Sequence, residues 1–276
     1  MQPKAHHLNW AFSSMGCHEH DLESLLNLAH QFGFEHIELR CVGGCLDLPG
    51  EFALHPAGRE QGLRHIQESG VRVPVLASGL NLVSPAFGDS VVAWAELADA
   101  LQSPWVRVFG AGGSSGTPSE QQWQMILSNL AFWRQCRSQT GFKSELLVET
   151  HDLFATTGSC QQLFVRLGHG VPLLWDIQHT GGTHGEPPRE TWEALGPWVQ
   201  HVHVSDRSCL GSPFEIVLPG SGVLPVIETL EILAKAQFEG VVSLEWEKLW
   251  HPEIPSLEEA LHAARKHWFA LEAGTR

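Results

Sequence analysis

Short apolar runs alternate with longer amphipathic segments along the whole chain. The short runs are rich in Val, Ile, Leu and Trp, which is typical of strands that are covered on both faces. They predict eight strands, at His7–Phe12, His36–Arg40, Arg72–Ser78, Trp105–Phe109, Leu146–His151, Leu173–Ile177, His201–Ser205 and Val241–Glu247. The segments between them predict eight helices, at Asp21–Phe32, Gly58–Ser69, Ser90–Leu101, Ser119–Thr140, Ser159–Leu167, Arg189–Leu195, Leu224–Ala236 and Ser256–Leu271.

The starts of three predicted helices carry residues that cap helices. Asp21, Ser119 and Ser256 each precede an amphipathic run, where a side-chain oxygen can accept from a free backbone N–H. Eight strand–helix units in 276 residues favour an α/β fold, a single (β/α)8 TIM barrel over residues 1–276. A doubly wound open sheet is the alternative, but Ser13–Cys17 is a poor match to the Gly-rich turn which that fold needs after its first strand.

The charge and composition of the chain exclude several classes of protein. The formal net charge is −14, with 17 Lys and Arg against 31 Asp and Glu, which disfavours a nucleic-acid binder. No apolar run approaches the roughly 20 residues that span a bilayer, and the N-terminus lacks the apolar segment of a signal peptide. The six cysteines form no CxxC pair. We therefore expect a cytoplasmic protein with reduced thiols that binds neither nucleic acid nor membrane.

Polar residues end the last four predicted strands, on the face where barrel enzymes place their active sites. They are Glu149, Asp176, His203 and Glu245, spaced 27, 27 and 42 residues apart, about one strand–helix unit per step. A lone carboxylate at a strand end is commonly a cap or an ion-pair partner. Three carboxylates buried together would be costly without a cation. With the imidazole they suit Mn²⁺, Mg²⁺, Co²⁺ or Zn²⁺, so they predict one divalent metal ion.

Five segments together resemble the xylose isomerase-like barrel superfamily, the sugar phosphate isomerase/epimerase group that is also described as AP endonuclease family 2. They are Gly33–Arg40, Val148–Asp152, Trp175–Thr180, His201–Asp206 and Ser243–Lys248. The resemblance implies that one metal ion is bound by Glu149, Asp176, His203 and Glu245. It also implies that His179 contacts a sugar substrate, and Arg207 is a further match. The chain departs from the ketose 3-epimerases at Ala155, where they carry glutamate, and from inositol-type members at Ser205, where several carry lysine.

The resemblance further implies an isomerase or epimerase of a keto-sugar or a polyol-derived ketone, with Mn²⁺ as the preferred metal. In such enzymes the metal stabilises an enediolate while a carboxylate moves the proton. We expect Glu149 and Glu245 to be the catalytic pair. A lyase or dehydratase that starts with the same proton abstraction is the main alternative. A sugar-binding subunit without catalysis and an endonuclease are weaker alternatives, and a homo-oligomer remains open.

Other polar and aromatic residues have both a functional and a structural interpretation. His151 and His201 could support the metal ligands or pack in the core. Glu38 could bind a sugar hydroxyl or pair with Arg40, and Lys248 could bind an anionic substrate or be solvated. Further candidates are the inward-facing Arg107, the possible sugar-stacking residues Trp10, Trp246 and Trp250, and two glycine-rich loops, Gly110–Gly116 and Pro219–Gly222.

Overall fold

Seven parallel strands form one curled sheet in the computed structural model, which describes residues 7–54, 58–111 and 116–269. The strands are β1 (Asn9–Phe12), β2 (Val75–Asn81), β3 (Trp105–Phe109), β4 (Glu145–Glu149), β5 (Leu173–Asp176), β6 (Val199–Val204) and β7 (Val241–Leu244). Their order in the sheet is β1-β7-β6-β5-β4-β3-β2. From β2 to β7, strands that follow each other in the chain are therefore neighbours, and β1 pairs with β7.

Residues 36–40 occupy the eighth position of the sheet, between β1 and β2. Glu38 pairs with Ser13 and Leu39 pairs with Leu76, each as an isolated parallel bridge. His36 also bridges Arg72, so the four residues from His36 to Leu39 face the five from Arg72 to Leu76. That one-residue slip breaks the ladder, which is why the predicted strand is not a regular strand. It nevertheless closes the ring, and the prediction of a (β/α)8 barrel is confirmed.

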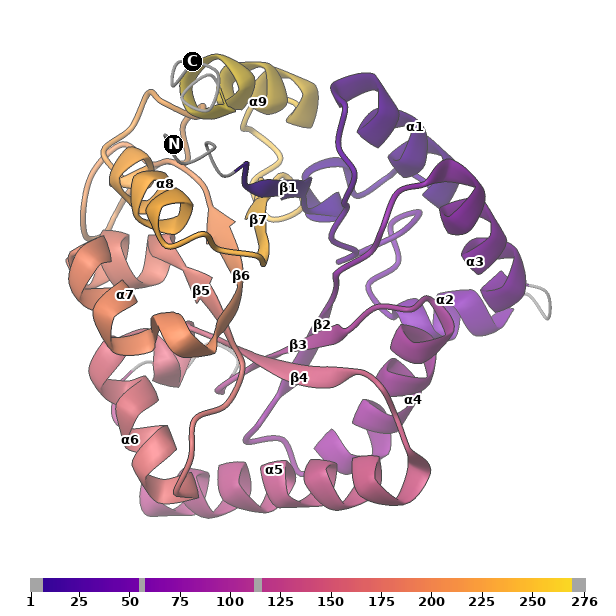
Figure 1. Cartoon of the computed structure of the whole chain (residues 1–276), viewed down its shortest axis with the longest axis vertical. Coiled ribbons are helices and arrows are strands. Elements are labelled where there is room, and N and C mark those ends of the chain that lie inside the picture. Colours follow the sequence, from indigo (N-terminus) through magenta and orange to yellow (C-terminus); the bar gives the residue numbers. More distant parts are fainter. Residues whose placement is uncertain (1–6, 55–57, 112–115, 270–276) are drawn as a thin grey trace, which may run out of the picture.

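Helices surround the sheet (Figure 1). They are α1 (Leu22–Phe32), α2 (Leu48–Leu54), α3 (Gly58–Ser69), α4 (Phe87–Ala100), α5 (Glu120–Thr140), α6 (Thr157–Leu167), α7 (Pro188–Leu195), α8 (Val226–Lys235) and α9 (Leu257–Ala264). The predicted caps are confirmed: Asp21 accepts from Ser24, and Ser119 and Ser256 form capping boxes. Sequence patterning missed α2, since it is short and contains Pro49 and Gly50. The predicted end of the last helix, at Leu271, lies outside the described residues.

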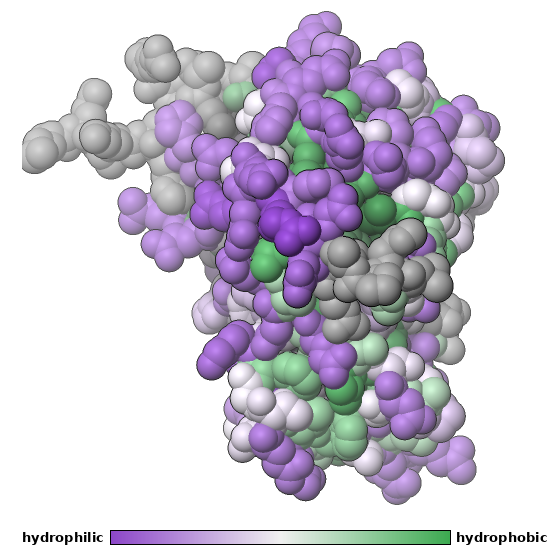
Figure 2. All heavy atoms as spheres, turned by 90° about the vertical axis from the view of Figure 1, so that its right-hand side faces the viewer, coloured by the Kyte–Doolittle hydropathy of each residue, from purple (hydrophilic) through white to green (hydrophobic). Residues whose placement is uncertain are grey.

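Apolar side chains from the strands and from the inner faces of the helices form one continuous core. Trp246, one of the predicted sugar-stacking residues, is completely buried in it, and its indole N–H donates to the carbonyl of Pro255 at 2.8 Å. The side formed by α1, α3 and α4 is mostly hydrophilic at its surface, with apolar residues gathered mainly toward the lower end of the view (Figure 2). Within the described ranges, no helix has the length and apolar character needed to cross a bilayer.

Candidate metal centre

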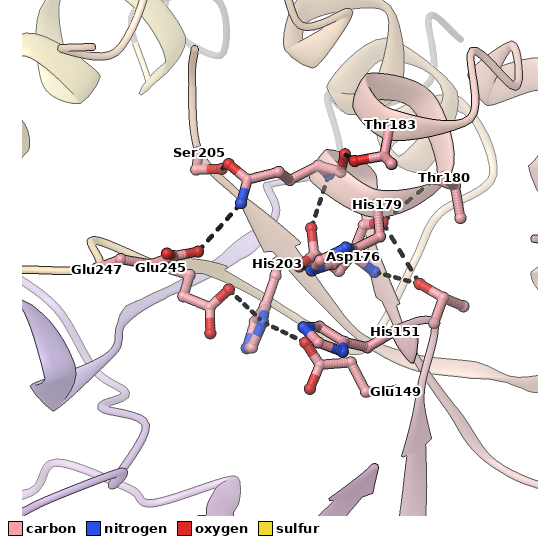
Figure 3. Close-up of polar contacts among 12 residues, drawn as sticks. Glu149, His151, Asp176, His179, Thr180, Thr183, His203, Ser205, Glu245 and Glu247 are labelled. Atoms are coloured by element: carbon pink, nitrogen blue, oxygen red, sulfur yellow. Dashed lines mark hydrogen bonds and ion pairs between the residues drawn. The ribbon is translucent and has the colours of Figure 1, made fainter. Parts of the chain in front are cut away.

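The four predicted metal ligands converge at the carboxyl ends of β4 to β7. Glu149 and Asp176 are the last residues of β4 and β5, His203 lies in β6, and Glu245 directly follows β7. The register pairs Asp176 with His203, and His203 with Ser243, which keeps the ligands at similar depth. One ligand atom from each of the four lies within 4.8 Å of those of the others. Figure 3 shows His203 between Glu149 and Glu245.

The charges of this cluster call for a cation. Burial and the nearby carboxylates of Glu245 and Glu149 raise the pKa of Asp176 well above its usual value. One oxygen of Asp176, Oδ1, accepts from the backbone N–H of Gln178 at 2.7 Å, whereas the buried Oδ2 has no hydrogen-bond partner. A divalent ion would offset the repulsion between the carboxylates and would occupy the free oxygen. The donor set therefore fits a hard or borderline divalent metal.

A fourth carboxylate, from Glu38, contacts the imidazole of His203. Glu38 Oε2 lies 2.7 Å from Nε2 of His203 and 2.8 Å from Nε2 of His201. The other ring nitrogen of His203, Nδ1, is 3.1 Å from Glu245 Oε2 and 3.6 Å from Glu149 Oε1. If Nε2 donates to Glu38, Nδ1 carries the lone pair toward the carboxylate cluster. A hydrogen bond of this kind commonly fixes the tautomer of a metal-binding histidine.

Glu38, His201 and His203 form a second group whose atoms are close enough to hold a metal. Each of the three is completely enclosed, with 0% of its surface exposed. Glu245 is 8% exposed, so only the first group reaches an open face. A catalytic metal needs an open coordination position for substrate. The first group is therefore the better candidate for a catalytic metal, and Glu38 and His201 lie where they can support its histidine.

The position of Glu38 in the structure agrees with neither of the two roles that the sequence suggested for it. Its enclosure leaves no exposed surface for a sugar hydroxyl, and no ion pair joins it to Arg40 in the described part of the chain. Burial alone would raise the pKa of Glu38, but His203 and His201 hold it well below its usual value. Glu38 is therefore a buried anion that is held by two imidazoles.

Arg107 contacts the predicted ligand Glu149 from the neighbouring strand β3. Its Nη1 lies 3.0 Å from Glu149 Oε2, and each side chain is 2% exposed. The guanidinium carbon also lies 3.9 Å from the ring centre of Phe109. Burial would raise the pKa of Glu149, but the charges of Arg107 and His203 hold it well below its usual value. Glu149 therefore stays ionised, as both a metal ligand and a base require.

Two histidines lie beside the ligands. The ring centres of His151 and His179 are 3.9 Å apart, and His179 Nε2 is 3.5 Å from Asp176 Oδ2 (Figure 3). Burial and the charge of His151 lower the pKa of His179 to about 3. Burial alone would lower the pKa of His151, but its contact with Asp152 and the charge of Glu149 raise it to about 9. The structure thus brings His179 and His151 to the site, one neutral and one cationic.

Gln178 and Glu247 belong to the same surroundings, although sequence reasoning did not single them out. Gln178 donates to Glu247 Oε1 at 3.1 Å and accepts from the hydroxyl of Ser205 at 3.1 Å. Burial and the charge of Glu245 raise the pKa of Glu247 to about 7. A signal existed in the sequence, because Ser243, Glu245 and Glu247 alternate along one face. The prediction stopped at Glu245.

Two other predicted substrate contacts have partners within the protein. Arg207 is completely buried, with Nη1 3.3 Å from the hydroxyl of Thr183 and its guanidinium carbon 4.3 Å from the ring centre of Phe214. The amine of Lys248 donates to the carbonyls of Pro252 and Ile254. Arg207 has no exposed surface, and the amine of Lys248 is already used by two backbone carbonyls, so neither cation is free for a direct substrate contact.

The remaining candidates lie in packing contacts or loops. Trp10 packs on Phe269, with ring centres 4.2 Å apart, and Trp250 is exposed. In the loop Pro219–Gly222 the backbone N–H groups of Gly220 and Gly222 both donate to Asp206 at 2.9 Å, so a carboxylate of the protein already fills that turn. Most of the other glycine-rich loop, at residues 112–115, lies outside the described residues.

The chain matches a known protein family over most of its length. A model of the family described as xylose isomerase-like TIM barrel matches residues 26–267. No curated protein is similar enough in sequence to match.

Solved structures share the fold at low sequence identity. The probable 3-DHS dehydratase AsbF involved in petrobactin synthesis from Bacillus anthracis has a TM-score of 0.73 and 17% identity, covering 94% of this chain and 98% of that one. The IOLI protein with a binding zinc atom has a TM-score of 0.73 and 17% identity, covering 94% and 96%. A D-allulose 3-epimerase from Methylomonas sp., in complex with D-allulose, has a TM-score of 0.71 and 14% identity, covering 98% of each chain.

Proposed function

Because this chain belongs to the xylose isomerase-like TIM barrel family, we propose that it is a divalent-metal-dependent isomerase or epimerase of a keto-sugar or polyol-derived ketone. The observation that carries the proposal is the convergence of Glu149, Asp176, His203 and Glu245 at the carboxyl ends of four successive strands. The D-allulose 3-epimerase and the zinc-binding IOLI protein support it as structural neighbours.

We assign the metal to Glu149, Asp176, Glu245 and Nδ1 of His203. When bound, a divalent ion supplies Lewis-acid stabilisation of the charge that develops on the substrate oxygens, worth several kcal/mol. Mn²⁺ is our first choice, since oxygen donors predominate, and Mg²⁺, Co²⁺ and Zn²⁺ also suit the set. When Nε2 of His203 donates to Glu38, Nδ1 is the ring nitrogen left for the metal.

Glu149 and Glu245 are the proposed acid and base. They lie on either side of His203, on strands separated by β5 and β6 (Figure 3). In this proposal one carboxylate removes the proton beside the carbonyl, and the other returns a proton on the opposite face. Glu245 is the more exposed of the pair. His179 and His151 are the proposed substrate contacts, whereas we give Arg207 and Lys248 internal roles.

Elimination is the second candidate reaction. One structural neighbour is a probable dehydratase, and the position where ketose 3-epimerases carry a further glutamate holds the buried Ala155. A lyase would use the same proton abstraction and then expel a hydroxyl group in place of reprotonation. We do not propose nucleic acid as a substrate, since acidic residues outnumber basic ones by 31 to 17.

The experiment is solvent-deuterium exchange. Mn²⁺-loaded protein is incubated in D₂O with ketoses, inosose and 3-keto sugars, and the products are followed by NMR. Deuterium uptake without loss of water indicates isomerisation or epimerisation, and loss of water indicates elimination. Glu149→Gln should abolish both, whereas Glu35→Gln, at a side chain that is 77% exposed, should change neither. Normal exchange in Glu149→Gln would exclude Glu149 as a base, and no exchange with the wild type would favour a binding protein.

A further inference from the structure

A second buried cation, Arg40, lies beside the carboxylate cluster. It ends the segment 36–40 that closes the barrel, two residues beyond the inward-facing Glu38. The alternation of side chains puts Arg40 on the same inward side, nearer the carboxyl end. A Cβ added to the exposed Gly79 at the end of β2 would lie 3.7 Å from Arg40 Nη2. The guanidinium of Arg40 is therefore at the open end of the barrel.

Arg40 lacks the partner that a buried charge normally has. It is only 8% exposed, yet no side-chain hydrogen bond or ion pair in the described part of the chain involves its guanidinium. Burial and the neighbouring charge of Arg107 lower the pKa of Arg40 to about 10, while Glu245 and Glu149 act in the opposite direction. A buried cation next to another cation is unfavourable unless an anion offsets both.

Arg40 and Arg107 lie on a different part of the barrel from most of the proposed metal ligands. Arg107 belongs to β3 and Arg40 to the segment before β2, whereas the ligands belong to β4 to β7. Arg107 uses Nη1 toward Glu149, and its Nε has no hydrogen-bond partner. A molecule that reaches from the metal ligands toward β2 would therefore meet the guanidinium of Arg40, with the charge of the more deeply buried Arg107 behind it.

We propose that Arg40, reinforced by the charge of Arg107 behind it, forms a subsite for an acidic group on the substrate, so that the enzyme acts on a sugar or cyclic polyol ketone that carries a carboxylate or a phosphate. This inference rests on the proposed function, because it places the reacting ketone at the metal ligands and the acidic group at Arg40. Both anions match the planar, forked donors of a guanidinium. A neutral sugar hydroxyl would leave the charge of Arg40 without an opposite charge.

The test compares three probes on Mn²⁺-loaded protein by calorimetry: D-fructose, D-fructose 6-phosphate and D-fructuronate. At least one acidic probe should bind tenfold or more tightly than D-fructose, since a hydrogen bond to a charged group contributes about one factor of ten or more. The tighter of the two acidic probes identifies the anion. Arg40→Gln should lose the preference, and Arg40→Lys should keep part of it. The matched control Arg72→Gln removes an exposed arginine and should keep all of it.

Thermal unfolding gives a second measurement. The preferred acidic probe should raise the unfolding temperature of the wild type and of Arg72→Gln, but not that of Arg40→Gln. If both acidic probes bind no better than D-fructose, or if Arg40→Gln keeps the preference, the subsite does not exist. Mn²⁺ binding and deuterium exchange are measured on the same samples. If Mn²⁺ binds and deuterium exchanges but the acidic probes are not preferred over D-fructose, only the subsite is disproved. If an acidic probe is preferred but Mn²⁺ does not bind, only the proposed function is disproved.

Discussion

Replacing Glu38 with Gln should weaken metal binding, although Glu38 is not one of the proposed ligands. Glu38→Gln keeps the shape of the side chain and removes its charge. The hydrogen bond from His203 Nε2, at 2.7 Å, then changes from charge-assisted to neutral, which costs about 1–1.5 kcal/mol. Loss of a buried negative charge near the ion adds to that cost. Together these effects predict a 10- to 100-fold loss of metal affinity, or about 1.4–2.7 kcal/mol.

The loss should depend on pH in a defined direction. Burial would lower the pKa of His203, but Glu245, Glu38 and Glu149 raise it well above its usual value, so a proton competes with the metal at Nδ1. Removing the charge of Glu38 lowers that pKa and weakens the competing proton. At low pH this change partly offsets the lost orientation of the ring, and at high pH it does not. The deficit of Glu38→Gln should therefore be larger at pH 9 than at pH 6.

Calorimetric titration with Mn²⁺ at both pH values measures the effect, with Glu35→Gln as the control for loss of an exposed carboxylate. Wild-type affinity in Glu38→Gln at pH 9 would refute the orienting role. The rival arrangement, with metal on Glu38, His201 and His203, makes a different prediction. It requires Asp176→Asn to bind Mn²⁺ with wild-type affinity and His201→Gln to lose Mn²⁺ binding. That pair of results would place the metal on Glu38, His201 and His203.

Three further outcomes follow from the contacts. Asp176→Asn should lose most of its affinity for Mn²⁺, measured by calorimetric titration. Because it removes one of three crowded carboxylates, it should also raise the unfolding temperature of the metal-free protein, measured by scanning calorimetry. Wild-type affinity for Mn²⁺ should rise by up to about tenfold per pH unit below the raised pKa of His203, since one proton is displaced, and a pH-independent affinity would exclude the imidazole as ligand. Ser119→Ala should lower the free energy of unfolding of the protein by about 1 kcal/mol through loss of its capping box, measured by urea denaturation, whereas Ser119→Asp should not.

Much of the site could be predicted because it depends on local order. The strands have a period of two and alternate with helices, so a polar residue at a strand end marks the carboxyl face without knowledge of any contact. Glu149, Asp176, His203 and Glu245 were found in this way, and the register between β5 and β6 places two of them side by side. The arrangement of parallel strands then brings the side chains together.

Contacts between distant parts of the chain could not be predicted in this way. Glu38 meets His201 and His203 across 163 and 165 residues, and no local pattern distinguishes it from a carboxylate at a surface strand end. The slip that makes residues 36–40 irregular arises from their pairing with residues 72–76, which lie about 36 positions further along the chain. Likewise, Arg40 looked like the partner of Glu38 in the sequence, but in the structure Glu38 is already held by two imidazoles.

The same contacts connect the proposed metal centre to closure of the barrel. Residues 36–40 are joined to the strands on either side by isolated bridges in place of a continuous ladder, so this is the least regular part of the ring in its backbone pairing. The carboxylate of Glu38 adds a link from this segment to β6 through His203. A metal bound at Nδ1 of His203, as we propose, would favour the ring orientation in which Nε2 donates to Glu38. Since this coupling is reciprocal, closure of the segment strengthens metal binding by the same free energy by which the metal strengthens closure.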